Sequence, residues 1–78
     1  MSKFIEAAKK LAEDYNALNE LLGQTEPRTV DAIILTSQFV QLEGERSAFF
    51  KSCNWADEVW SAFCSTLDPS PYWNFPAA

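Results

Sequence analysis

The stretch TVDAIILTSQFVQLEGERSAFFKSC, residues 29–53, decides the fold that we expect for this chain. One line of residues along it advances by alternating steps of four and three: Leu35, Phe39, Leu42, Arg46, Phe49 and Cys53. This spacing predicts an α-helix with an apolar stripe that carries a charge only at Arg46. A second apolar face, over the first half, contains Val30, Ile33, Ile34 and Val40. A helix that is apolar on two sides needs partners on both, so we expect it to be central.

Gly44 is the position at which this helix could be interrupted. A glycine inside a helix costs about 1 kcal/mol relative to alanine, so the helix could kink there, or stop and restart at Glu45. The apolar stripe keeps its phase through Gly44, which favours a single helix. A β-strand over residues 30–36 would suit the β-branched side chains, but the sequence offers no second strand to pair with it.

Two further helices are expected beside the central one. The residues from Phe4 to Leu22 repeat the four–three spacing, and Gly23 follows where a left-handed C-cap belongs, so we expect a helix over residues 3–22. The short connection to the next helix contains Pro27 and favours an antiparallel pair. Asn54 is a suitable N-cap for a third helix over residues 55–67. The predicted fold is all-α, a small three-helix bundle that forms one domain over residues 1–78.

Residues 68–78 form a tail of different composition. Three prolines exclude a helix and favour an extended path, and the aromatic residues Tyr72, Trp73 and Phe75 are too apolar for a solvated tail. The tail either folds back over the third helix and closes the core, or docks into another molecule. Aromatic residues beside prolines are good anchors because ordering them costs little chain entropy. We therefore count these three residues as candidate partner-binding residues.

Composition and charge argue against several classes of function. The net charge of −5 disfavours direct binding of nucleic acid or an anionic membrane, because both need a basic face. The chain has no His and only two Cys, Cys53 and Cys64, so we expect neither a metal site nor a His-activated nucleophile. The two glycines are far apart and form no phosphate-binding loop. We expect no cofactor and no enzymatic activity.

The expected location of the chain is the cytoplasm. No apolar run approaches the roughly 20 residues of a membrane-spanning helix. The first residues lack the apolar segment of a secretory signal, so Cys53 and Cys64 are expected to remain buried free thiols in a reducing compartment.

The outer face of the first helix is acidic. Glu6, Glu13 and Glu20 recur every seven residues, and Asp14 follows Glu13. Such a pattern is typical of an ordinary solvated helix face. Its functional interpretation is an acidic strip that binds a basic surface of a protein partner. We take these four residues as further candidate partner-binding residues.

Three hypotheses for the function follow from size and charge. The first is a small protein-binding module that inhibits a host nucleic-acid-processing protein by covering its basic surface, as phages and mobile elements do against host defences. The second is a structural or assembly subunit, in which Val30, Ile33 and Val40 mediate self-association as a homodimer or a larger ring. The third is a regulator that acts by protein contact, because no helix carries a basic stripe for reading DNA.

Overall fold

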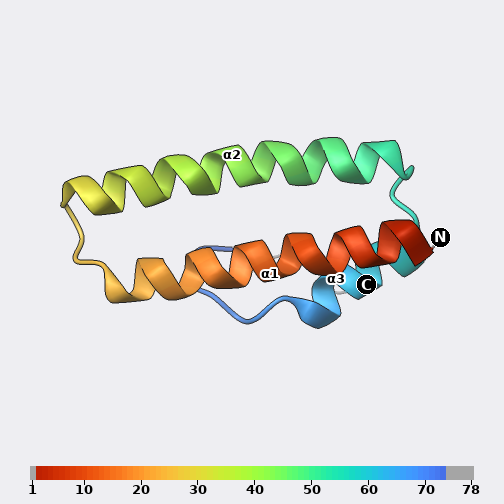
Figure 1. The fold of residues 1–78 in the computed structure, drawn as a ribbon, viewed down its shortest axis with the longest axis horizontal. Coiled ribbons are helices and arrows are strands. Elements are labelled where there is room, and N and C mark those ends of the chain that lie inside the picture. The colour runs from red at the N-terminus through yellow and green to blue at the C-terminus, as the bar shows by residue number, and fades with distance from the viewer. Residues whose placement is uncertain (1, 74–78) are drawn as a thin grey trace.

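The computed structural model describes residues 2–73 and contains three α-helices and no strand within that range (Figure 1). The first two helices run antiparallel, and the third folds back along the first (Figure 1). The helices are α1 (Ser2–Gln24), α2 (Val30–Ser52) and α3 (Asp57–Thr66). The predicted all-α three-helix fold is confirmed, and each predicted helix end lies within two residues of the observed one.

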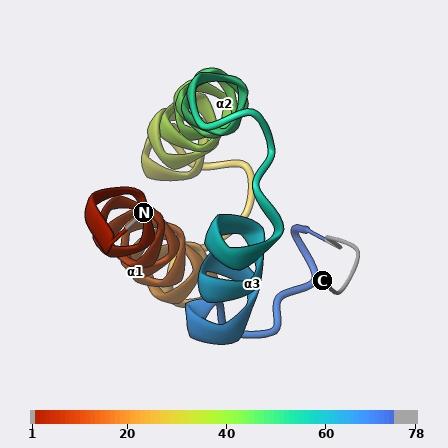
Figure 2. The ribbon, with the colours of Figure 1, turned by 90° about the vertical axis from the view of Figure 1, so that its right-hand side faces the viewer.

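The central helix is α1, and our expectation that α2 would be central is wrong. α1 packs against both α2 and α3, whereas α2 and α3 have few contacts with each other (Figure 2). The reason is that only one of the two apolar faces of α2 is covered. The stripe from Leu35 to Cys53 packs on the core, with Leu42 buried, while Val30, Ile33 and Val40 are exposed.

α2 is one continuous helix that passes through Gly44 without a break. At its start, the hydroxyl of Thr29 accepts a hydrogen bond from the backbone N–H of Ala32, at 3.2 Å. This side-chain cap satisfies one of the backbone donors that every helix N-terminus leaves free. Because α2 is continuous from Val30 to Ser52, it does not break at Gly44, and residues 30–36 do not form a strand.

The end of α1 differs from the prediction. α1 continues through Gly23 to Gln24, and neither glycine of the chain has a positive φ. The left-handed residue of the connection is Arg28, with φ of 66°, immediately before the capping Thr29. The short connection nevertheless sets α1 and α2 antiparallel, as predicted (Figure 1).

The link between α2 and α3 also differs, because Asn54 does not cap α3. Asn54 and Trp55 both have left-handed backbones, with φ of 59° and 53°, and the N-cap position belongs to Ala56. The backbone N–H of Trp55 donates to the carbonyl of Phe50 at 2.8 Å, while the two rings stack with centroids 5.4 Å apart. Packing of Trp55 on the end of α2 therefore accompanies the sharp reversal of the chain.

The core is an aromatic cluster centred on Tyr15 of α1. The Tyr15 ring lies edge-on to Phe39 of α2, Phe63 of α3 and Trp73 of the tail, with centroid distances of 6.0, 5.7 and 5.3 Å. Each such aromatic pair contributes about 0.5–1.5 kcal/mol beyond the burial of its area. The buried hydrophobic residues are Ala8, Ala12, Tyr15, Leu18, Leu42, Phe50, Val59 and Phe63.

Two asparagines of α1 hold the chain that follows α3. The side chain of Asn16 donates to the carbonyl of Thr66 at 2.9 Å and accepts from the backbone N–H of Asp68 at 2.7 Å. One turn later, the side-chain oxygen of Asn19 accepts from the hydroxyl of Ser70, also at 2.7 Å. These contacts hold the start of the tail on α1, although the bonded residues are about fifty positions apart in the sequence.

Trp73 joins the tail to the core, which favours the core-closing alternative for this residue. Its half-buried ring stacks on Phe39 with centroids 6.1 Å apart and packs edge-on against Tyr15. The tail was expected to cover the third helix, but these two ring partners come from α2 and α1. Tyr72 is exposed, and Phe75 lies outside the described residues.

Candidate protein-binding surfaces

Arg46, the charged residue of the α2 stripe, belongs to a polar cluster with Tyr15 and Glu43. The hydroxyl of Tyr15 donates to Glu43 Oε1 at 2.5 Å and accepts from Arg46 Nε at 3.2 Å. Arg46 Nη2 also donates to Glu43 Oε2 at 3.3 Å. Burial, aided by the hydrogen bond to Glu43, raises the pKa of the Tyr15 hydroxyl well above its ordinary value. These hydrogen bonds tie α1 to α2.

The four acidic candidates on α1 are all exposed, but they do not form one surface. Glu6, Glu13 and Glu20 lie along the outer face of α1, because a spacing of seven residues returns nearly to the same side of a helix. Asp14 is turned about 100° from Glu13 and borders the gap towards α2. Its ion pair with Lys10, at 3.8 Å, is solvent-exposed and contributes little to stability.

Asp14 lines an open groove between α1 and α2, which we call the acidic groove. It consists of two adjoining hollows of about 430 and 220 Å³, and both are lined by Asp14 of α1 and Glu45 of α2. The lining residues of both hollows come from α1 and α2 alone, and α3 packs on α1 (Figure 2). Its apolar lining residues are Ala7, Leu11, Ala17, Leu18, Leu21, Leu42 and Phe49.

Glu45 is a groove residue that the sequence analysis missed. We treated Glu45 only as a possible new helix start after Gly44. The sequence contained one signal, the position of Glu45 around the axis of α2. Glu45 is turned about 100° from Arg46 and therefore lies on the flank of the core stripe. That position became informative only once the structure showed that α1 lies beside that flank.

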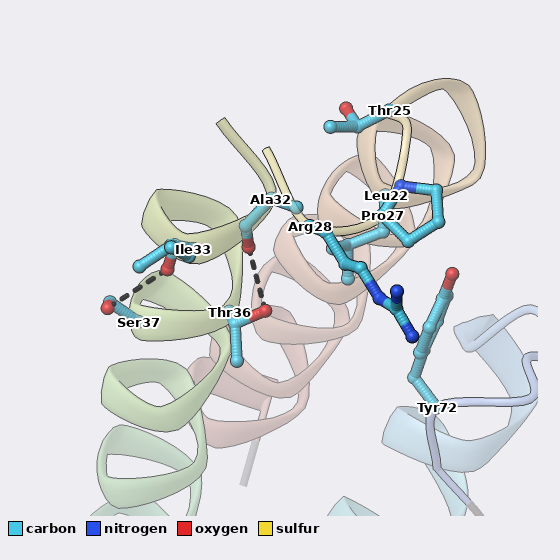
Figure 3. A pocket seen from close by; sticks show the side chains of 9 residues that line it. All are labelled: Leu22, Thr25, Pro27, Arg28, Ala32, Ile33, Thr36, Ser37 and Tyr72. Carbon is cyan, nitrogen blue, oxygen red and sulfur yellow. Dashed lines mark hydrogen bonds between the residues drawn. The ribbon is translucent and has the colours of Figure 1, made fainter. Parts of the chain in front are cut away.

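Tyr72 lines a separate hollow of about 510 Å³ near the connection between α1 and α2 (Figure 3). Arg28 extends towards Tyr72 across this hollow (Figure 3). The hydroxyls of Thr36 and Ser37 donate to backbone carbonyls four residues earlier in α2, at 2.8 and 3.1 Å (Figure 3). The full lining is Leu22, Thr25, Pro27, Arg28, Ala32, Ile33, Thr36, Ser37 and Tyr72.

The residues predicted for self-association lie on the outer face of α2, turned away from the core. Val30 is 71% exposed, and Ile33 and Val40 are each 64% exposed. Ile34, on the adjoining flank, is also exposed. Contiguous exposed apolar residues of this kind often mark an interaction surface on a soluble protein. The candidate residues are thus divided among the acidic groove, the outer face of α1, the outer face of α2 and the tail.

Comparisons with known proteins identify no relative: no protein-family model matches the chain, and neither curated proteins nor solved structures gave a match. Within residues 2–73, no three His, Cys, Asp or Glu residues lie close enough together to hold a metal ion. None of the three helices in that range has the apolar length that crossing a bilayer requires. Cys53 and Cys64 are not joined by a disulfide, and they are half-buried rather than fully buried.

Proposed function

We propose that this chain is a protein-binding module and that the acidic groove receives a basic amphipathic helix of its partner. The observation that carries this proposal is the position of Asp14 and Glu45, which come from two helices and line the same two hollows together with seven apolar side chains. Amphipathic helices bind in apolar grooves through side chains spaced one helical turn apart. A Lys or Arg beside those side chains would form charge-assisted hydrogen bonds with the two carboxylates.

The net charge of the chain supports a basic partner. The chain carries −5 in total, and Glu6, Glu13 and Glu20 add exposed negative charge on the outer face of α1 beside the groove. Such a field accelerates the encounter with a positively charged surface and disfavours acidic partners. Clustered Lys and Arg on a protein commonly bind nucleic acid. A partner covered in this way would lose nucleic-acid binding, so we propose that the chain acts as an inhibitor, of the kind directed against host defences.

Capture of the partner from a host lysate, at about physiological salt and again at high salt, tests the proposal. We expect a basic protein that is retained at physiological salt and reduced at high salt, because the charge contribution is screened. Adding the purified chain should release nucleic acid from that protein. Failure to capture a basic protein, or undiminished nucleic-acid binding by the captured one, would refute the inhibitor function.

A pair of charge-matched variants assigns the binding to the groove. The double variant Asp14→Asn/Glu45→Gln should weaken partner binding by roughly tenfold or more, because both changes remove a carboxylate from the groove. The control variant Glu26→Gln/Glu58→Gln removes two exposed charges elsewhere and should change affinity by less than about threefold. Equal losses in the two variants would show that net charge, and not the groove, determines binding.

A further inference from the structure

We propose, independently of the partner-binding function, that the hollow beside the connection between α1 and α2 binds a small apolar carboxylic acid. The hollow has a volume of about 510 Å³, which lies within the range of small-molecule pockets, roughly 300–1,000 Å³. Four of its nine lining side chains are aliphatic, and one, Arg28, is charged (Figure 3). None of the nine lines the acidic groove, so the two sites are separate.

Arg28 presents a charged group to the hollow that other residues leave unused. Its backbone has a left-handed φ of 66°, and its side chain extends across the hollow towards Tyr72 (Figure 3). Among residues 2–73, no carboxylate forms an ion pair with Arg28, and its side chain takes part in no hydrogen bond. The nearest acidic residues in the sequence, Glu26 and Asp31, are exposed and do not line the hollow. The guanidinium can therefore bind a ligand without first breaking a contact within the chain.

The hydroxyls that line the hollow restrict the kind of polar group that a ligand can bring. Thr25, Thr36 and Ser37 each donate to a backbone carbonyl four residues earlier, at 2.7, 2.8 and 3.1 Å. Each hydroxyl has a single proton, so these three offer a ligand only their oxygen lone pairs. Among the described lining side chains, the remaining donors are those of Arg28 and Tyr72. A ligand group that reaches Arg28 must therefore be an acceptor.

One guanidinium beside an aliphatic wall favours a carboxylate attached to an apolar body. The planar guanidinium binds a carboxylate through two parallel N–H···O bonds. Leu22, Pro27 and Ile33 supply the surface against which the apolar body would be buried. A cationic ligand would be repelled by Arg28, and a dianion such as a phosphate would find only one charged partner.

The apolar part of the site continues inward from the hollow. A second hollow, of about 130 Å³, adjoins the first and shares Leu22, Thr36 and Tyr72 with it. Its remaining lining residue is Phe39, which belongs to the aromatic cluster around Tyr15. An aromatic ring of the ligand placed here would lie beside the rings of Tyr72 and Phe39, where aromatic pairs are favourable. The expected ligand is therefore a carboxylate joined to an aryl group by a short chain.

Titration of phenylbutyrate into the isotope-labelled chain, followed by backbone amide NMR shifts, tests the proposal. About a dozen non-hydrogen atoms in an open hollow support only weak binding, so we expect saturable shifts at Thr25, Ile33 and Ser37 with a dissociation constant of about 0.1–1 mM. Phenylbutanol and phenylbutylamine keep the apolar body without the carboxylate, and they should bind at least about fivefold more weakly. Absence of saturable shifts at the hollow up to about 10 mM, tenfold above the expected range, would overturn the proposal. Equal binding of the acid and the amine would overturn it as well.

Two pairs of matched variants assign the binding to the hollow. Arg28→Gln should weaken phenylbutyrate binding at least about fivefold, whereas Lys51→Gln removes the same charge at the other end of α2 and should change it less than about twofold. Ile33→Ala should weaken binding about threefold, because it removes apolar contact from the lining. Val40 is exposed to the same extent, 64%, but lies outside the hollow, so Val40→Ala should leave binding unchanged. All four residues are exposed, so the variants should keep the wild-type melting temperature. Equal losses within either pair would overturn the assignment of the ligand to this hollow.

Discussion

Replacing Trp73 with alanine tests whether the tail is a structural part of the domain. The Trp73 ring packs edge-on against Tyr15 at 5.3 Å and stacks on Phe39 at 6.1 Å, and its Nε1 donates to the Asp68 carbonyl at 3.2 Å. Truncating a fully buried tryptophan costs about 3–5 kcal/mol. Because Trp73 is only half-buried, we expect the free energy of unfolding to fall by about 2–3 kcal/mol, including the two ring contacts.

Thermal and urea unfolding, followed by circular dichroism, measure this loss. In a domain of this size, each kcal/mol shifts the melting temperature by roughly 4–8 °C, so the midpoint for Trp73→Ala should fall by roughly 10–20 °C. The matched control is Tyr72→Ala, which truncates the neighbouring aromatic residue. Tyr72 is exposed, so its removal should cost less than about 1 kcal/mol.

A melting temperature within about 2 °C of the wild type would refute this reasoning, because the loss would then be below about 0.5 kcal/mol. The tail would in that case contribute nothing to the core, and Trp73 would again be a candidate anchor for a partner, as the sequence alone allows. A loss of equal size in Tyr72→Ala would also contradict it, because the exposed ring would then matter as much as the packed one.

Three further predictions concern single positions in the helices. Gly44→Ala should raise the free energy of unfolding by about 0.5–1 kcal/mol in a urea titration, because a Cβ at this position meets no atom within 4 Å beyond the adjacent residues and the neighbouring backbone of its own helix. A decrease would contradict the open space at this site. Tyr15→Phe should lower the free energy of unfolding by about 1–2 kcal/mol, because the ring contacts remain while the hydrogen bonds with Glu43 and Arg46 are lost. An unchanged urea midpoint would contradict a stabilising role for the cluster of Tyr15, Glu43 and Arg46. The difference in free energy of unfolding between wild type and Tyr15→Phe should be constant below about pH 10 and shrink above it. The reason is that the raised pKa of Tyr15 in the folded chain makes the unfolded chain lose this proton first. Urea midpoints between pH 8 and 11 measure the trend, and a difference that grows with pH would contradict it.

The sequence predicts the helices well because long periodic patterns define them redundantly. The stripes from Phe4 to Leu22 and from Leu35 to Cys53 each extend over about five turns, so a single weak position such as Gly44 does not end a helix. The same patterns could not show which helix is central. α2 has two apolar faces with similar composition, and periodicity does not reveal that a chain of this length covers only one of them.

Helix ends and long-range polar contacts were less predictable. Gly23 and Asn54 both have the residue types that favour caps, but capping preferences amount to about 1 kcal/mol and are overridden by packing, such as that of Trp55 on Phe50. The hydrogen bonds that Asn16 and Asn19 make with the tail join residues about fifty positions apart. No local pattern in the sequence encodes such a pairing, so only the assembled fold reveals it.

The candidate binding surface was predictable in part. The acidic character of α1 was evident, but the structure separates Asp14, which lines the groove, from Glu6, Glu13 and Glu20, which face outward. Glu45 could be assigned to the groove only from the packing of α2 beside α1. The exposure of Val30, Ile33 and Val40 was one of two outcomes that the sequence allowed, because a third helix could have covered that face.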